Sequence, residues 1–200
     1  MTLVKVPPFS YCNWVTTLYL KYRAQTLDQL DLEEVREPLK KMVSSGKIPH
    51  AILLSGPKGT GKTSTARILA KILNCQNLRD SNEPCNKCEQ CLSITRGSNL
   101  DVIELDAASH RGIEDIRALR DAVKLSPAKA EKKVYIIDEA HMLTTEASNA
   151  LLKTLEEPPN HVFFILATTN PEKLLETIRS RSLNLVFKKA QASELVRSLE

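Results

Sequence analysis

The glycine-rich run at residues 56–63 has the spacing of a phosphate-binding loop. It reads Gly-Pro-Lys-Gly-Thr-Gly-Lys-Thr, which fits the P-loop pattern G-x-x-x-x-G-K-S/T, and it stands between an apolar run and a helical pattern. Glycines let backbone N–H groups turn toward one point, where the next helix adds partial positive charge. A glycine-rich turn with a chance lysine is the alternative, which the flanking strand and helix disfavour. The predicted phosphate contacts are Gly56, Pro57, Lys58, Gly59, Thr60, Gly61, Lys62, Thr63 and Ser64.

Two acidic residues, Asp138 and Glu139, end the apolar run at residues 134–137. Beside a P-loop, an Asp at the end of a strand can hold Mg²⁺ through water, and the Thr63 hydroxyl can be a ligand of the same ion. Lys62 can reach the β and γ phosphates, while Glu139 can orient and polarise the attacking water. The alternative is two solvated acidic residues at a strand end. Paired with the P-loop, the Asp-Glu sequence favours an ATPase over a GTPase-like protein.

Four of the five cysteines lie close together in a polar segment, with the spacing Cys75-x9-Cys85-x2-Cys88-x2-Cys91. Four thiolates suit a tetrahedral Zn²⁺ ion, and because no ligand position stays open, such a site is structural. The spacing of the last three is also compatible with an iron–sulfur cluster. Four free thiols in an exposed loop are disfavoured because they would oxidise. Cys12 lies outside this group and is interpreted as incidental.

Apolar periodicity predicts strands that alternate with helices. Short apolar or β-branched runs indicate strands, and apolar residues at helical spacing indicate helices. This alternation predicts an α/β fold with a parallel sheet covered by helices on both faces. The expected strands are 51–54, 100–105, 133–137, 161–167 and 183–187, and the expected helices begin near residues 32, 62, 112 and 146.

Composition limits the class of protein without deciding it. The 200 residues suffice for one domain with a sizeable core, and 42% of them are hydrophobic. Lys and Arg number 28 against 24 Asp and Glu, a net charge of +4 that permits nucleic-acid contact without arguing for it. No apolar run reaches the roughly 18 residues of a membrane span, and residues 1–10 lack a signal-peptide core. A cytoplasmic location, with no membrane partner, is therefore expected.

Taken together, these motifs resemble the motor domain of bacterial DNA polymerase III gamma/tau clamp-loader subunits. The four-cysteine insert after the P-loop helix distinguishes this group from the small clamp-loader subunits of eukaryotes and archaea. The resemblance extends over residues 17–190. Besides the P-loop and the cysteines it rests on Thr17–Arg23, Asp106–Ser109, Asp138–Leu143, Asn149–Pro159, Ala167–Thr169 and Ser180–Ser182.

The resemblance implies a P-loop AAA+ RecA-like fold over residues 17–190, with a small zinc module at about residues 74–95. Residues 191–200 would then be the start of a truncated lid domain, while residues 1–16, which lack clear periodicity and contain Pro7-Pro8, are expected to form a disordered or atypical arm. Tyr22 and Arg23 would lie on the adenine side of the nucleotide. Thr169 would sense the γ-phosphate, and Arg181 would act in trans on the nucleotide of a neighbouring subunit.

The activity implied is that of an ATP-binding and ATP-hydrolysing motor in the DNA polymerase III holoenzyme, which loads a sliding clamp onto primer–template DNA. Its cofactors would be Mg²⁺ with ATP and a structural Zn²⁺. Its partners would be the delta and delta prime subunits, further gamma/tau copies, the clamp and the DNA. The alternatives are a non-hydrolysing structural subunit, another AAA+ DNA-processing ATPase, and a zinc-binding DNA module with a vestigial nucleotide site.

Overall fold

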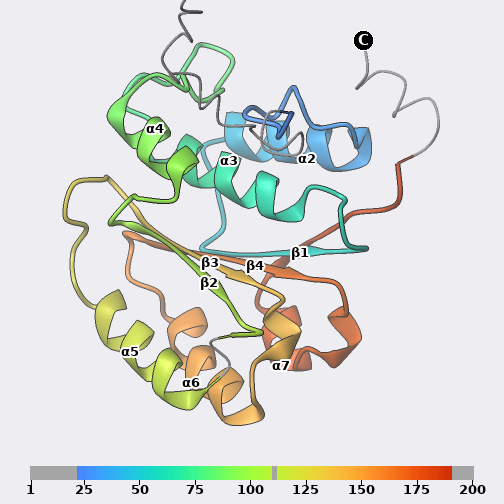
Figure 1. The fold of residues 1–200 in the computed structure, drawn as a ribbon, viewed down its shortest axis with the longest axis vertical. Helices are drawn as coiled ribbons and strands as arrows, with labels where there is room; N and C mark the ends of the chain where they lie inside the picture. Colours follow the sequence, from blue (N-terminus) through green and yellow to red (C-terminus); the bar gives the residue numbers. More distant parts are fainter. Residues whose placement is uncertain (1–21, 110–111, 191–200) are drawn as a thin grey trace, which may run out of the picture.

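The computed structural model describes residues 22–109 and 112–190, which form a parallel sheet with helices on both faces (Figure 1). The strands lie in the order β2-β3-β4-β1-β5, and every neighbouring pair is parallel. The expected arm at 1–16 and the expected lid at 191–200 lie outside the described residues. The strands are β1 (Ala51–Ser55), β2 (Val102–Asp106), β3 (Lys133–Asp138), β4 (Val162–Thr168) and β5 (Leu183–Val186).

Burial follows the position of each strand in the sheet. All five residues of β1 and all seven of β4 are buried, because helices cover both of their faces. The edge strands β2 and β5 keep partly exposed residues along their length. The continuous apolar sequence of β1 and β4 therefore marks the centre of the sheet, and the mixed sequence of β2 and β5 marks its edges.

The helices divide between the two faces of the sheet (Figure 1). One face carries α2, α3 and α4, and the other carries α5, α6 and α7. Each face has its own hydrophobic core, with Leu69 buried in the first and Leu151 in the second. The helices are α2 (Glu33–Ser44), α3 (Lys62–Asn74), α4 (Glu89–Arg96), α5 (Ile113–Val123), α6 (Thr145–Glu156) and α7 (Glu176–Ser180).

The expected α/β architecture is confirmed, and two helices are additions to it. All five predicted strands and the four predicted helices are present, with ends shifted by a few residues. Sequence periodicity missed α4 because only three of its residues are buried and one of these is Cys91. It missed α7 because five residues are too few for a periodic pattern. Among the described residues, no helix is long and apolar enough to cross a membrane.

The register of the strands brings their carboxyl ends to one edge of the sheet. Ser55 at the end of β1 is paired with Thr168 at the end of β4, and Asp106 at the end of β2 with Asp138 at the end of β3. Ligands of open α/β sheets bind beyond the carboxyl ends of the strands, where neighbouring connections diverge. A ligand site is therefore expected among the residues that follow these strand ends.

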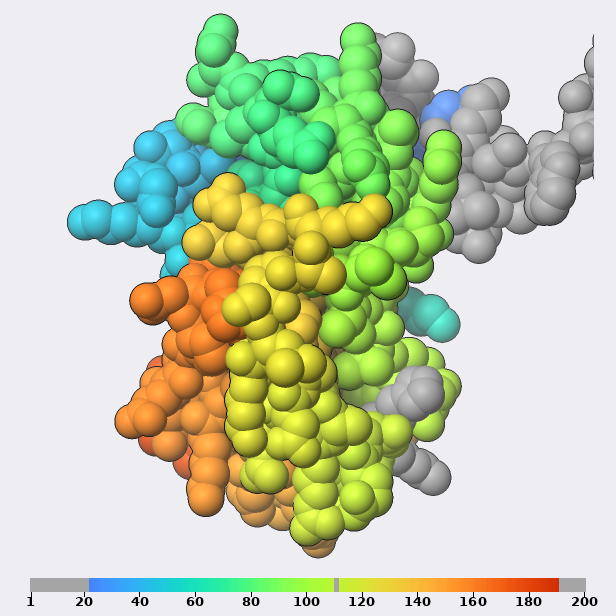
Figure 2. Space-filling model, turned by 90° about the vertical axis from the view of Figure 1, so that its left-hand side faces the viewer, coloured from blue at the N-terminus to red at the C-terminus, as the bar shows by residue number. Residues whose placement is uncertain are grey.

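A buried carboxylate holds the loop between α5 and β3 against the rest of the fold. Asp101, which precedes β2, is 2% exposed. Its oxygens accept the backbone N–H groups of Ala128, Lys129 and Ala130 at 2.7, 2.8 and 2.8 Å. In Figure 2 this loop, coloured yellow, crosses the middle of the visible face beneath the green insert. Burial raises the pKa of Asp101, but the three N–H groups and Lys133 outweigh burial and hold the pKa below its usual range.

We expect Asp101→Asn to lower the free energy of unfolding by about 2 kcal/mol at neutral pH, because charge-assisted hydrogen bonds are weakened. A depressed folded-state pKa means that this stabilisation is complete above the unfolded pKa of about 3.9 and is lost as the pH falls through the folded value. The difference in free energy of unfolding between the wild type and Asp101→Asn should therefore become smaller at acid pH. Urea unfolding at pH 7 and at acid pH measures both effects.

The matched control is Asp121→Asn, which changes a side chain that is 67% exposed and pairs with Lys124. Exposed pairs of this kind contribute little, so the control should unfold like the wild type. Equal stability of Asp101→Asn and Asp121→Asn at pH 7 would contradict the assignment of an anchoring role to Asp101.

Candidate functional site

The P-loop leaves the end of β1 through a backbone path that only glycine can follow. Gly56, Gly59 and Gly61 have φ angles of 145°, 83° and 92°, in the region that disfavours side chains. The Gly56 N–H donates to the carbonyl of Thr168 at 3.1 Å. A Cβ atom on Gly56 would lie 2.1 Å from the backbone oxygen of Phe187. The start of the loop is therefore fixed between the ends of β4 and β5.

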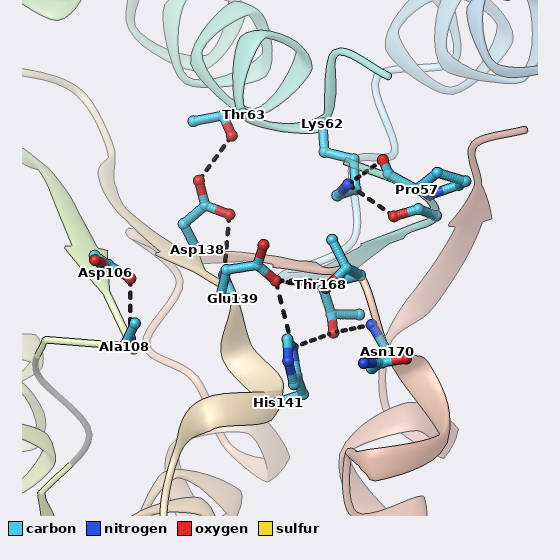
Figure 3. Close-up of polar contacts among 12 residues, drawn as sticks. Pro57, Lys62, Thr63, Asp106, Ala108, Asp138, Glu139, His141, Thr168 and Asn170 are labelled. Carbon is cyan, nitrogen blue, oxygen red and sulfur yellow. Dashed lines mark hydrogen bonds and ion pairs between the residues drawn. The ribbon is translucent and has the colours of Figure 1, made fainter. Parts of the chain in front are cut away.

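Lys62 is the first residue of α3, and its ammonium group turns back over the loop (Figure 3). The Nζ atom donates to the carbonyl oxygens of Gly56 at 2.8 Å and Pro57 at 2.7 Å. Burial lowers the pKa of Lys62, while the negative charges of Glu139 and Asp138 act in the opposite direction. The cation therefore lies at the centre of the loop, where the phosphates of a nucleotide would need it.

Thr63 and Asp138 connect the P-loop helix to the end of β3 (Figure 3). The Thr63 hydroxyl donates to Oδ2 of Asp138 at 2.7 Å. Both groups offer oxygen ligands, which Mg²⁺ prefers, and Mg²⁺ commonly takes only one or two ligands from a protein and the rest from water and phosphates. The donor set therefore fits the magnesium ion predicted from the sequence.

Glu139 is held in a left-handed conformation, with φ of 47°. Its Oε2 atom accepts the Thr169 hydroxyl at 2.9 Å and the Thr169 N–H at 3.3 Å. His141 approaches the same oxygen at 3.4 Å and bonds Thr168 at 3.0 Å through Nδ1 (Figure 3). A non-glycine residue in this region of backbone space requires support from its surroundings, and such residues gather at functional sites. The structure therefore joins two predicted catalytic residues, Glu139 and Thr169, by direct bonds.

A groove of about 1050 Å³ opens beside the P-loop. Predicted contacts Tyr22 and Arg23 line it together with five residues of the loop and α3. The remaining walls come from the segment before α2, from Val35 of α2 and from the residues that follow β5. Its size is that of a small-molecule site. The lining residues are Tyr22, Arg23, Ala24, Gln25, Asp28, Gln29, Leu30, Asp31, Leu32, Val35, Lys58, Gly59, Thr60, Gly61, Ser64, Phe187, Lys188, Lys189 and Ala190.

The four predicted metal ligands converge on one point. The sulfur atoms of Cys75, Cys85, Cys88 and Cys91 all lie within 4.8 Å of one another. Zn–S bonds of about 2.3 Å in a tetrahedron separate the sulfurs by roughly 3.8 Å, so the cluster has nearly the required size. Closed tetrahedral coordination by four thiolates therefore fits the residues present.

Backbone groups in this cluster favour a thiolate at Cys85. Burial raises the pKa of Cys85, but the N–H groups of Lys87 and Cys88, which donate to its sulfur at 3.4 and 3.3 Å, outweigh burial and lower the pKa to about 6. Burial raises the pKa of Cys75 and of Cys91. Because metal ligands must be deprotonated, the lowered pKa of Cys85 favours its coordination of a metal ion.

Arg181 stands apart from the groups at the strand ends. It follows α7, and its guanidinium group pairs with Glu156 of α6 at 2.8 Å and donates to the carbonyl of Thr177 at 3.1 Å. Its side chain is 39% exposed. All the other predicted site residues fall into two groups. One group forms the strand-end site with its groove, and the other forms the cysteine cluster. Arg181 belongs to neither group and faces outward on the α6–α7 side.

Three polar residues near Glu139 received no site role from the sequence, although two of them, His141 and Thr168, lie in runs that resemble the family. His141 and Thr168 contact each other, and the N–H of Asn170 donates to Thr168 at 3.1 Å (Figure 3). Thr168 could have been identified from its place in the sequence, because it ends β4. The end of β4 lies beside the end of β3, where Asp138 and Glu139 stand. A polar residue at the end of a buried apolar strand is the pattern that would have found it.

The sheet order β2-β3-β4-β1-β5, with a P-loop after β1 and the acidic pair Asp138 and Glu139 at the end of β3, is that of the AAA+ class of P-loop folds. RuvB from Thermotoga maritima, described as a Holliday junction branch migration motor, has the same fold with a TM-score of 0.57. The match covers 89% of this chain and 52% of RuvB, at 21% sequence identity. At that level of identity, the likeness establishes the fold alone.

Sequence comparison identifies the family. The family model described as DNA polymerase III, delta subunit matches residues 32–191. The tau subunit of DNA polymerase III from Bacillus subtilis is 50% identical over 180 residues, and that from Escherichia coli is 49% identical over 181 residues. The chain therefore belongs to this family of DNA polymerase III clamp-loader subunits, and the gamma/tau resemblance is confirmed. It spans 32% and 28% of the length of these two relatives, each of which covers 90% of the chain.

We expect Gly56→Ala to destabilise the fold by about 3 kcal/mol or more, because the new methyl group collides with the Phe187 carbonyl and the φ angle is unfavourable. In a protein of this size the unfolding temperature should fall by roughly 10 °C. The control is Gly112→Ala, whose Cβ would meet its nearest neighbour, Oδ2 of Asp115, at an ordinary 3.5 Å. If the thermal unfolding curves of Gly56→Ala and Gly112→Ala coincide, the close approach of Gly56 to the carbonyl of Phe187 is wrong.

Proposed function

We propose that this chain is the ATP-binding and ATP-hydrolysing motor of a DNA polymerase III clamp-loader subunit. One observation carries the proposal. Lys62 over the P-loop, Thr63 bonded to Asp138, and Glu139 bonded to Thr169 form one connected polar site at the carboxyl ends of the strands. Family membership gives the site its biological setting, which is the loading of a sliding clamp onto primer–template DNA.

ATP is proposed to bind with its phosphates in the P-loop and its base in the adjoining groove. The backbone N–H groups of Gly56 and of residues 58–64 would face the phosphates, and Lys62 would neutralise the β and γ positions. Tyr22 and Arg23 line the groove, which supports contacts to the base and ribose. Lys188 and Lys189 add positive charge along the same groove.

Hydrolysis is proposed to use Glu139 as the residue that orients and polarises the attacking water. Thr169, bonded to Glu139, is proposed to sense the γ-phosphate and so to couple its presence to the position of the carboxylate. Thr63 and Asp138 would hold Mg²⁺, one directly and one through water. The ion, when bound, supplies neutralisation of charge on the phosphate oxygens.

Arg181 is proposed to complete the active site of a neighbouring subunit. Its outward position on the α6–α7 face supports a contact made between subunits, and a guanidinium group suits the charge of a transferring phosphoryl group. The proposed neighbours are delta, delta prime and further gamma/tau copies. The sliding clamp and DNA would engage the assembled ring, with DNA held through its phosphates, in the bacterial cytoplasm.

The cysteine cluster is proposed to hold a structural Zn²⁺ ion within an ATPase domain formed by residues 17–190. Its module comprises about residues 74–95, and the four convergent sulfurs support it. When bound, the ion would link the four cysteines of this polar insert and leave no coordination position open for a substrate. One zinc per chain in elemental analysis is the expected result, and iron in its place would contradict the assignment.

We expect Lys62→Ala to abolish measurable ATP binding, because the loop loses the ammonium group that is proposed to contact the β and γ phosphates. Equilibrium titration of the 200-residue chain with fluorescently labelled ATP and Mg²⁺ measures this. Lys47→Ala, which removes an exposed lysine of the turn after α2, is the control and should bind like the wild type. Binding that survives Lys62→Ala would place the nucleotide elsewhere.

We expect Glu139→Gln to retain ATP binding and to lower the rate of hydrolysis by about 100-fold or more, in the range of general-base contributions. The wild-type chain alone should turn over slowly, since Arg181 of a neighbour is missing, so single-turnover measurements with radiolabelled ATP are required. Glu146→Gln in the first turn of α6 is the matched control. Equal rates for the two variants would exclude Glu139 as the catalytic group.

A further inference from the structure

Glu83 is a buried carboxylate that connects the cysteine insert to a distant part of the chain. It lies in the loop between Cys75 and Cys85 and is 3% exposed. Its two oxygens accept the backbone N–H groups of Leu27 at 2.9 Å and Asp28 at 3.1 Å. Burial of a carboxylate is costly unless its oxygens are hydrogen-bonded, so these two bonds fix the relative positions of the two segments.

Asn86 makes a second connection between the same two segments. Its side-chain amide donates to the carbonyl of Gln25 at 3.2 Å. Lys71 of α3, which is 1% exposed, donates to the side-chain oxygens of both Asn86 at 2.8 Å and Gln25 at 2.5 Å. The buried ammonium group therefore joins the P-loop helix, the insert and the segment before α2 at one point.

The segment held in this way is a wall of the groove beside the P-loop. Gln25 and Asp28 line that groove, with Leu27 buried in the core beneath them. Residues 58–61 of the P-loop line the same groove. The position of this wall relative to the P-loop therefore depends on contacts made by the insert, which is not itself part of the groove lining.

The sulfur cluster controls the geometry of both connecting residues. Cys75 and Cys85 stand at the two ends of the loop that carries Glu83, and the N–H of Cys85 donates to the sulfur of Cys75 at 3.3 Å. Asn86 directly follows Cys85 and has a left-handed φ of 56°. A metal ion on the four sulfurs would close the loop and fix this turn, so that Glu83 and Asn86 face residues 25–28.

We propose that Glu83 and Asn86 are positioning residues for the nucleotide, through which the four-cysteine module sets the wall of the groove that receives the base and ribose. This inference rests on the proposed ATP site. The phosphates contact the P-loop, which the insert does not touch through these bonds. Loss of the connection therefore weakens binding of the whole nucleotide and leaves binding of a bare polyphosphate unchanged.

The test compares dissociation constants for ATP and for inorganic tripolyphosphate, both measured by calorimetry on the zinc-loaded 200-residue chain. Glu83→Gln should raise the dissociation constant for ATP about tenfold, as expected when a binding-competent wall is populated about a tenth of the time. The constant for tripolyphosphate should not change. Asp80→Asn, an equivalent change at an exposed residue of the same loop, is the matched control and should alter neither.

A second variant and metal removal extend the test. Asn86→Asp keeps a residue that tolerates the left-handed turn, replaces the donor to Gln25 by a carboxylate oxygen and keeps an acceptor, now charged, for Lys71, so it should act in the same direction as Glu83→Gln. Chelation of the metal should weaken ATP binding in the wild type and add little to the effect of Glu83→Gln, because both act through one connection. Unchanged tripolyphosphate binding confirms that each sample retains its fold.

The outcomes separate this inference from the proposed function. A wild-type chain that binds neither ligand would overturn the ATP site and the inference with it. A wild type that binds both, with ATP binding insensitive to Glu83→Gln, to Asn86→Asp and to chelation, would overturn the inference alone. Equal weakening of ATP and tripolyphosphate would also overturn it, since the module would then act on the fold as a whole.

Discussion

The close passage of Gly56 between the ends of β4 and β5 is the constraint on which the site depends. The chain leaves β1 with its N–H bonded to Thr168 and its Cα facing the carbonyl of Phe187, where no side chain fits. This fixes the first residue of the P-loop and, a few residues later, the first turn of α3. Because β3 lies beside β4, the Thr63 hydroxyl in that turn then reaches Asp138.

Buried charged groups stabilise the irregular segments that apolar burial does not reach. Asp101 fixes the loop before β3, and Glu83 and Lys71 fix the segment before α2. In each case the partners are backbone or amide groups that lie far away in the sequence. A buried charge that lacks a hydrogen-bond partner destabilises the fold by more than a formed hydrogen bond stabilises it. These contacts therefore determine where the segments lie more than they increase the stability of the fold.

The sequence predicted those features of the site that are local patterns. The P-loop, the Asp-Glu pair and the cysteine spacing each lie within a short stretch, and the apolar runs indicated where the strands would lie. The contacts of Glu139 with Thr169, of His141 with Thr168, and of Glu83 with Leu27 depend on how strands and loops distant in sequence are placed. A single sequence holds no periodic signal for such pairs. Arg181 was named through family resemblance alone, since nothing in its local sequence distinguishes it from a surface arginine.

The parallel pairing of β1 has a consequence for the time at which the site can form. Its partners are β4 and β5, and Ala51 pairs with Phe164 and Ile52 with Leu183. Contacts so distant in sequence close large loops and slow folding. During synthesis on the ribosome, β1 and its P-loop emerge long before either neighbouring strand exists. The phosphate-binding loop therefore takes its final shape among the last parts of this domain, once Phe187 has left the ribosome and closed against Gly56.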